Sequence, residues 1–423
     1  MNSLAVYLHG RRAGTLERLP QARLRFAYSP SYASEGGAPI SLSLPLREEA
    51  FEDAECGPFF QGLLPEGDFL RAIARTFHVS ADNPFAVLAA IGGECAGAIA
   101  LGSTEGPVPG TDAPPPRWLD DAELRELLEE LPERPLALLD EVEDEDGIRI
   151  SLAGAHDKIG VLCEEARIGL TRGAPPSTHI LKMPIARVAE PIVDEAYCMA
   201  LAATVGLDVA AAEPREAGRR EFLLVRRYDR VPEAPADTRI HQEDFCQALG
   251  VAPPEKYEGE GGPSVSGCAA LLWRASSAPA RDVVAFADAL LFNFLIGNHD
   301  AHAKNYSLLL DGPEAIRLAP LYDLLCTPVF AGTRKKLAMK YGGENRPKYL
   351  RRRHLDRLAD ELAVKPTLVR NRAERMIELI GDNAGAAREA LPAAFQDRPL
   401  LDEIAALTEE RRERLAKAVT EEP

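Results

Sequence analysis

Alternating hydrophobic and polar positions near the start of the chain predict a small sheet. Residues 4–8 are mostly apolar, a Gly-containing turn follows, and residues 24–28 alternate between apolar and polar side chains, as strands with one buried face do. Residues 39–45 are bracketed by prolines and predict an edge strand, because proline cannot donate a ladder hydrogen bond. A capped helix over residues 82–91 belongs to the same α+β unit, which we place at residues 1–105.

Further along, short strands precede long apolar helices. Residues 159–163, 168–170 and 179–183 have the composition of a small antiparallel run of strands. Apolar residues also dominate residues 190–202 and 283–296, which predict helices. The second of these helices is too short and carries too many polar residues to span a bilayer, so we interpret it as a buried helix.

The stretch between these parts has a different character. Residues 106–147 begin rich in Gly and Pro, continue as an amphipathic helix and end in an acidic run that is typical of a solvated loop. We interpret this stretch as a linker with an acidic helix. Residues 148–245 then form a small lobe that contains the strands, and residues 246–423 form a mainly helical lobe.

Composition and charge limit the classes of function. The chain has 423 residues, of which 46% are hydrophobic, so two or three domains with a substantial core are expected. A formal net charge of −17 argues against a surface that grips nucleic acid all over, although residues 334–375 are locally basic. The seven cysteines include no C-x-x-C pair, and the start of the chain lacks a secretory signal. We therefore expect reduced thiols in a cytoplasmic protein without a membrane segment.

The candidate chemistry is concentrated around Asp300. Four residues separate Asp300 from Asn305, which is the spacing of the catalytic loop of protein kinases. In that loop the Asp orients the acceptor hydroxyl and accepts its proton, and the Asn ligates magnesium on the nucleotide phosphates. Asp323 follows among apolar residues as a candidate second metal ligand, and Lys182 lies on a predicted strand as a candidate phosphate-binding residue. Each of these four residues alone has an ordinary structural explanation, but their occurrence together and in this order is a much more specific sign of a kinase site.

Other interpretations of these residues stay open. His299, Asp300 and His302 would also suit a three-ligand zinc site, although the kinase set explains more residues. The small residues of 151–158 would let backbone N–H groups approach phosphates, but the segment lacks the Gly-Lys-Ser/Thr ending of a P-loop and could equally be a hairpin turn. Glu195 is a candidate partner for Lys182, with a surface position as the alternative.

Segments spread along the chain resemble the HipA family, the serine/threonine kinase toxins of bacterial toxin–antitoxin pairs. The resemblance is carried by SLAGAHDK at 151–158, HILKMP at 179–184, FLLVRRYDR at 222–230, HQEDFCQALG at 241–250, NHDAHAKNYS at 298–307 and APLYD at 319–323. It implies an α+β, protein-kinase-like fold of two lobes behind an N-terminal subdomain. It also implies magnesium-dependent transfer of the ATP γ-phosphoryl group to a Ser or Thr hydroxyl.

The resemblance assigns roles to individual residues. It implies that Asp300 is the catalytic base, that Lys182 meets the phosphates, that Asn305 and Asp323 hold magnesium, and that Ser151 is autophosphorylated. It implies nucleotide contacts by a larger set: Ala153, Gly154, Ala155, His156, Asp157, Lys158, Lys182, Glu243, Asp244, Phe245, His302, Asn305, Tyr322 and Asp323. Within this set, residues 153–158 cover the nucleotide, and backbone groups of Glu243 and Phe245 meet the adenine edge. His156 stands where the family usually has Gln.

The resemblance further implies partners. These are a HipB-like helix-turn-helix antitoxin, a protein substrate such as an aminoacyl-tRNA synthetase, and DNA that is reached only through the antitoxin complex. The N-terminal unit would either brace the kinase or contact partners. Two other functions remain: a small-molecule kinase of the same fold, and a non-catalytic, antitoxin-dependent transcriptional corepressor.

Overall fold

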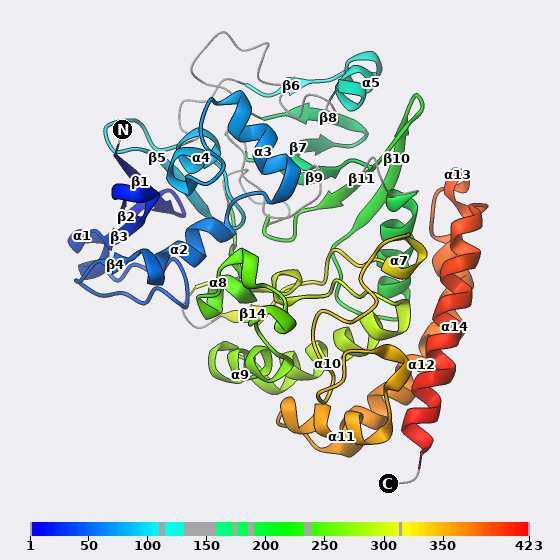
Figure 1. Ribbon diagram of the computed structural model, residues 1–423. Helices are drawn as coiled ribbons and strands as arrows, with labels where there is room; N and C mark the ends of the chain where they lie inside the picture. The colour runs from blue at the N-terminus through cyan, green and yellow to red at the C-terminus, as the bar shows by residue number, and fades with distance from the viewer. Residues whose placement is uncertain are drawn as a thin grey trace.

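The computed structural model describes residues 2–109, 115–130, 158–171, 176–184, 190–231, 238–312 and 315–421. Figure 1 shows three parts, which we name by their residues. The N-terminal unit comprises residues 2–109, the small lobe residues 115–231, and the helical lobe residues 238–421. The site described below lies where the three parts meet. The predicted site residues Ser151, Ala153, Gly154, Ala155, His156 and Asp157 lie outside the described residues.

The N-terminal unit is built on an antiparallel sheet. Its described strands have the order β4-β3-β2-β1-β5, with neighbours antiparallel. The strands and helices are β1 Ser3–Leu8, β2 Arg11–Arg18, β3 Leu24–Tyr28, α1 Pro30–Ser34, β4 Phe51–Glu52, α2 Asp53–Gly62, α3 Gly67–Thr76, α4 Pro84–Ile91 and β5 Ile99–Ser103. Side chains from the sheet and from α2, including Phe26, Phe51, Phe59 and Phe60, form a core of their own. The predicted first α+β unit is therefore present.

The expected edge strand at residues 39–45 is absent from this sheet, so that prediction was wrong. The segment is a loop with one isolated bridge, between Ser41 and Leu44. Pro39 and Pro45 lack the N–H groups that a strand would use, and the polar groups between them turn toward the helical lobe. There Ser41 Oγ and Leu42 N donate hydrogen bonds to the Glu243 carboxylate.

The small lobe contains the predicted antiparallel strands. In its described residues the strand order is β10-β11-β9-β7-β8-β6. The elements are β6 Arg117–Trp118, α5 Asp121–Glu130, β7 Lys158–Glu164, β8 Arg167–Leu170, β9 His179–Lys182, α7 Pro191–Thr204, β10 Ala212–Ala217 and β11 Arg220–Arg226. The acidic helix α5 packs Leu127 and Leu128 against this sheet. Part of the predicted linker thus belongs to the small lobe.

The helical lobe surrounds one buried helix. The elements are β12 His241–Asp244, α8 Phe245–Leu249, α9 Val265–Ala275, α10 Pro279–Ile296, β13 Ser307–Leu310, β14 Ile316–Leu318, α11 Arg352–Glu361, α12 Pro366–Glu389, α13 Ala393–Gln396 and α14 Pro399–Thr420. Every residue of α10 from Phe286 to Ile296 is buried, and α9, α12 and α14 pack around it, as expected for the helix at residues 283–296 (Figure 1). No helix in the described part of the chain is long and apolar enough to cross a membrane.

Helix α10 delivers the candidate catalytic segment into the interior. Gly297 ends the helix with a left-handed φ of +80°, which glycine adopts without strain. A Cβ at this position would lie 2.6 Å from Leu407 Cδ2, so packing also favours glycine. The chain then passes through residues 298–305 and returns along the hairpin of β13 and β14. This path brings Asn305 within hydrogen-bond distance of Asp323.

A buried ionic cluster joins the N-terminal unit to the small lobe. Arg227 donates to Asp229 at 2.7 Å and to Glu94 at 3.1 Å, and Arg230 donates to Glu94 at 2.7 Å. Ser177 and the Gly97 backbone N–H add hydrogen bonds to the carboxylates. Burial disfavours the ionised Glu94, but the two guanidinium groups outweigh burial and lower the pKa of its carboxyl. These buried charges are balanced by one another and not by water. Removing any one of them would therefore leave an uncompensated buried charge between the two parts.

We predict that Glu94→Ala destabilises the chain by about 3–5 kcal/mol, because it leaves two buried guanidinium groups short of a counter-charge. Urea unfolding followed by circular dichroism measures this loss. Glu35→Ala, which removes the exposed partner of Arg11, is the matched control and should leave the unfolding midpoint nearly unchanged. Equal midpoints for Glu94→Ala and the wild type would show that the cluster does not hold the parts together.

Candidate active site

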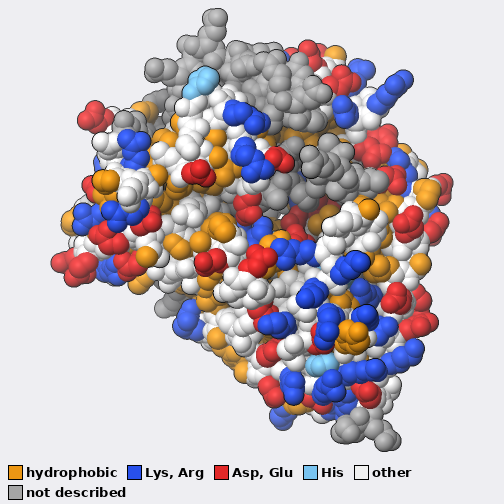
Figure 2. Space-filling model, viewed as in Figure 1, with side chains coloured by type: hydrophobic (Ala, Val, Ile, Leu, Met, Phe, Trp, Pro, Cys, Tyr) orange, Lys and Arg blue, Asp and Glu red, His pale blue; other side chains and the backbone are white. Residues whose placement is uncertain are grey.

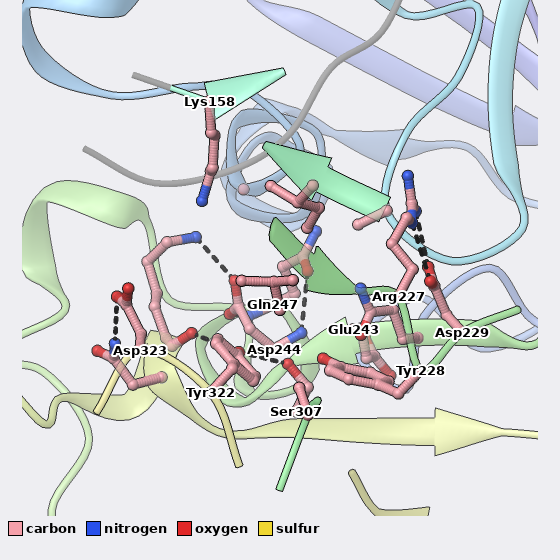
Figure 3. Close-up of a pocket in the computed structure, with 18 of the residues that line it drawn as sticks. Lys158, Arg227, Tyr228, Asp229, Glu243, Asp244, Gln247, Ser307, Tyr322 and Asp323 are labelled. Carbon is pink, nitrogen blue, oxygen red and sulfur yellow. Dashed lines mark hydrogen bonds and ion pairs between the residues drawn. The ribbon is translucent and has the colours of Figure 1, made fainter. Parts of the chain in front are cut away.

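The described residues form a pocket at the junction of the three parts (Figure 3). The N-terminal unit contributes Gly62, Glu66 and Ala96 to its wall, and the lobes contribute the rest. Of the candidate residues, those that line the pocket are Lys158, Lys182, Glu243, Asp244, Asp300, His302, Asn305, Tyr322 and Asp323. Residues that are far apart in the sequence therefore converge on one cavity.

Lys182 lies at the centre of a buried ion cluster. Its Nζ donates to Glu195 Oε1 at 2.5 Å and to Asp323 Oδ1 at 2.7 Å. Lys182 is 6% exposed and Glu195 3% exposed, so Glu195 is a buried partner rather than a surface residue. Burial disfavours the charged amine, but Asp323 and Glu195 outweigh burial and raise the pKa of Lys182. The ammonium is therefore charged at neutral pH, and it ties β9 and α7 to the segment after β14.

A hydrogen bond joins Asn305 to Asp323 at the pocket wall. Asn305 Nδ2 donates to Asp323 Oδ2 at 2.9 Å, which turns the amide oxygen Oδ1 away from that bond. This Oδ1 atom is buried and finds no hydrogen-bond partner among the described residues. Asp323 has a left-handed φ of +59°, a strained conformation of the kind that clusters at functional sites. Asn298 Nδ2 supports the strained segment by donating to Asp323 O at 3.3 Å.

These two residues fit a magnesium ion. Magnesium takes hard oxygen ligands and is usually held by one or two side chains together with substrate phosphates and water. A carboxylate beside a buried amide oxygen without a partner meets that demand. The pair therefore suits the metal that the sequence implied.

Asp300 lies at the edge of the pocket with one carboxylate oxygen engaged. Tyr257 OH donates to Asp300 Oδ1 at 2.8 Å. Burial raises the pKa of the Asp300 carboxyl, and the bond from Tyr257 works in the opposite direction. His302 packs its ring edge-on to Tyr257, and burial, helped by the Lys256 charge, lowers the pKa of His302 to about 3. His302 is therefore a neutral imidazole two residues after Asp300.

The zinc interpretation of this loop finds no support. His299 Nδ1 lies 2.6 Å from Arg334 O and its Nε2 lies 3.1 Å from the Arg411 guanidinium, so both ring nitrogens are engaged away from Asp300. His302 packs against Tyr257 instead of joining His299. Among the described residues, no group of three or more His, Cys, Asp and Glu side chains is arranged to hold a metal ion.

Lys304 is buried, and its charge is already balanced. Its Nζ donates to Asp244 Oδ2 at 2.7 Å and lies 3.9 Å from Glu66 Oε1 of the N-terminal unit. Lys304 is thus a buried residue of the pocket wall that links the loop between Asp300 and Asn305 to Asp244.

Residues 243–245, which the resemblance places as the hinge beside adenine, are contacted by the N-terminal unit. Glu243 is 1% exposed, and its carboxylate accepts from Ser41 Oγ at 2.5 Å and from Leu42 N at 2.9 Å. Asp244 caps α8 by accepting from Gln247 N. Phe245 is buried and does not line the pocket, and its N–H donates to Tyr306 O at 2.9 Å. Of the backbone groups that the resemblance assigns to the adenine edge, the Phe245 N–H is thus engaged within the protein.

Lys158 and Tyr322 complete the part of the predicted set that the structure describes. Lys158 lies opposite Lys182 in the register of β7 and β9, and its side chain extends into the pocket (Figure 3). Burial, and then the charge of Lys182, lowers the pKa of Lys158 to about 8. Tyr322 OH donates to Lys304 O at 2.8 Å and so supports the loop between Asp300 and Asn305.

The sequence did not reveal several residues of the site. Glu66 accepts from Lys256, Tyr257 donates to Asp300, and Arg334 lies over the Tyr257 ring. These residues lie in segments without hydrophobic periodicity. The only local hint was the adjacent Lys256 and Tyr257 in a polar, Gly-rich loop. Their long-range contacts are visible only in the folded chain.

A lysine held by two acids, an Asp-x4-Asn loop and a later Asp in one cleft between two lobes define a protein-kinase-like phosphotransferase. The family comparison agrees. The model of the HipA N-terminal domain matches residues 4–102, and the model of the HipA-like C-terminal domain matches residues 150–386, more than half of the chain. The chain belongs to the HipA family, and the expected α+β, kinase-like fold is confirmed.

Individual relatives extend over nearly the whole chain. The protein named "Putative kinase Y4mE" from Sinorhizobium fredii is 40% identical over 410 residues, covering 95% of this chain and 96% of that protein. The serine/threonine-protein kinase toxin HipA of Shewanella oneidensis is 29% identical over 378 residues, covering 86% of this chain and 84% of that protein. The solved complex of Shewanella oneidensis HipA with HipB and operator DNA matches with a TM-score of 0.80 and 25% identity, covering 98% of this chain and 96% of that one.

The buried Glu243 carboxyl yields a prediction about pH. Burial raises its pKa from 4.5 to about 7, although the bonds from Ser41 and Leu42 act against burial. Unfolding then releases a proton between about pH 4.5 and 7, so this group makes the fold less stable as pH rises through that window. Glu243→Gln carries no such proton and should lose less stability than the wild type between pH 5 and 7, as measured by urea unfolding.

Glu35→Gln, which alters an exposed carboxyl, is the control and should keep the wild-type pH dependence. Identical pH dependence of Glu243→Gln and the wild type would contradict a buried, neutral Glu243 at the hinge.

Proposed function

We propose that the chain transfers the terminal phosphoryl group of ATP, with magnesium, to a Ser or Thr hydroxyl of a protein. The observation that carries this proposal is the convergence of Lys182, Asp300, Asn305 and Asp323 on one pocket. The four residues come from separate segments, and phosphoryl transfer has a distinct role for each. Membership of the HipA family and the relative named as a serine/threonine-protein kinase toxin support the same reaction.

The roles follow from charge and position. The Lys182 ammonium is held in its charged form and can balance the nucleotide phosphates. Asn305 and Asp323 would hold magnesium, which when bound neutralises charge on the phosphates. Asp300 accepts the proton of the acceptor hydroxyl while the oxygen bonds to phosphorus and the bond to ADP breaks. His302, as a neutral ring, adds no charge beside that base.

We extend the proposal to the nucleotide-covering loop. Residues Ala153 to Lys158 would cover the phosphates, which is supported by the position of Lys158 at the pocket wall. Ser151, at the start of this segment, would be the autophosphorylation site. A phosphate there adds roughly −1.5 to −2 charges and would repel the phosphates of ATP.

We also propose that the chain is the toxin of a toxin–antitoxin pair, with a HipB-like protein as its partner and operator DNA reached through that complex. The match to the Shewanella oneidensis complex supports this assignment. Figure 2 shows many Lys and Arg side chains over the helical lobe. Several are neutralised within the chain, as Arg346 is by Glu344 and Arg351 by Glu421, which favours DNA contact through the partner over strong binding alone.

For the acceptor we propose a component of translation such as an aminoacyl-tRNA synthetase, on the strength of the family resemblance. A cytoplasmic location would suit both this acceptor and the seven cysteines, which are unpaired in the described chain.

Labelled ATP tests the reaction. Purified protein with magnesium and a cell lysate should transfer label to itself or to a lysate protein. Asp300→Asn should lower the rate by about 10²-fold or more, because the general base is lost. Excess EDTA should abolish transfer by removing magnesium. Asp360→Asn makes the same chemical change on an exposed helix position and should behave as the wild type.

The location of the label separates the alternatives. Peptide mapping should find self-label at Ser151, and Ser151→Ala should remove it. ATP binding without label on any protein would favour a small-molecule acceptor. A chain that does not bind ATP at all would contradict the proposed reaction and favour the corepressor. Asp300→Asn with wild-type transfer would contradict the role of Asp300 as the base.

A further inference from the structure

The loop between α8 and α9 places a tyrosine on the candidate base. Tyr257 OH donates to Asp300 Oδ1 at 2.8 Å. Among the described residues, no other side chain donates a hydrogen bond to the Asp300 carboxylate, and none is bonded to Oδ2. The orientation of this carboxylate therefore depends on one hydroxyl.

The tyrosine ring is itself held in place. The Arg334 guanidinium carbon lies 3.7 Å from the centre of the Tyr257 ring. The His302 ring packs edge-on against the same ring, with 5.1 Å between the two ring centres. Arg334 also forms an exposed ion pair with Glu260 at 2.9 Å, and Lys256, next to the tyrosine, is bonded to Glu66 at 2.6 Å. A ring with a cation on one side and an imidazole at its edge does not turn freely.

Tyr257 approaches Asp300 from outside the nucleotide pocket. Asp300 lines that pocket together with Lys182, Asn305 and Asp323, whereas Tyr257 and Arg334 do not. The hydroxyl thus takes one carboxylate oxygen without entering the space for phosphates. The second oxygen, Oδ2, is left for the acceptor hydroxyl.

We infer that Tyr257 is a positioning residue for Asp300, and that Arg334 acts through Tyr257 by fixing its ring. The inference rests on the proposed kinase reaction. In that reaction the acceptor proton passes to Asp300 as the new O–P bond forms and the bond to ADP breaks. A base that is misplaced by about 1 Å can lose about 10²-fold in rate, so one hydrogen bond that fixes the carboxylate matters.

Tyr257→Phe tests this inference, because it removes the hydroxyl and keeps the ring between Arg334 and His302. Initial rates of label transfer from ATP to a cell lysate, measured over a range of ATP concentrations, give a maximal rate and a KM. We expect the maximal rate to fall about 10- to 100-fold, while the KM for ATP stays within about twofold. Arg334→Ala leaves the hydroxyl but frees the ring, and should lower the maximal rate in the same direction.

Tyr349→Phe is the matched control. Tyr349 is exposed and also has cations over its ring, Arg346 at 4.4 Å and Lys348 at 4.8 Å, but it does not line the pocket. This variant should match the wild type. Calorimetric ATP binding by each variant shows that the pocket is intact, and Arg334→Ala decides the matter if Tyr257→Phe does not fold.

The contrary outcomes are distinct. An unchanged maximal rate in both Tyr257→Phe and Arg334→Ala would overturn the inference and leave the kinase reaction standing. A faster Tyr257→Phe enzyme would also overturn it, because the hydroxyl would then be blocking the acceptor. Absence of transfer by the wild type would refute the proposed reaction itself, and the inference with it.

Discussion

The arrangement of the active site depends on one buried charge. The Lys182 ammonium is shielded from water, and a buried ammonium is costly unless acids surround it. Glu195 from α7 and Asp323 from the loop after β14 meet this demand together. Because the two acids belong to different parts of the chain, the ion pairs that neutralise the lysine also hold the small lobe next to the segment that carries Asp323. Asp323 then orients the Asn305 amide by accepting from its Nδ2, while the amide oxygen stays buried without a partner among the described residues.

The N-terminal unit is part of this arrangement rather than an appendage. It contributes Glu66 to the pocket, holds the Glu243 carboxylate through Ser41 and Leu42, and is joined to the small lobe by the Glu94 cluster. Each contact places a polar group of the N-terminal unit on a buried ionisable group of a lobe. A change in the N-terminal unit is therefore expected to reach the hinge directly, which favours its interpretation as a brace of the lobes.

Local patterns explain what the sequence could predict. The strand that carries Lys182, the buried helix α10 and the hairpin of β13 and β14 have hydrophobic periods within single segments, and the Asp-x4-Asn spacing is local as well. The contacts that complete the site have no such signal. Ser41 meets Glu243 across 202 positions, and Tyr257 meets Asp300 across 43. The proline-bracketed segment at 39–45 had the composition of a strand, but its polar groups were needed at the hinge.

The most direct measurement is the calorimetric titration of wild-type protein and Lys182→Ala with ATP in the presence of magnesium. If the buried lysine is held for the nucleotide phosphates, the wild type binds and the variant loses most of its affinity while remaining folded by circular dichroism. A folded Lys182→Ala protein with undiminished affinity would contradict the account, because the central charge of the site would then have no part in holding the nucleotide.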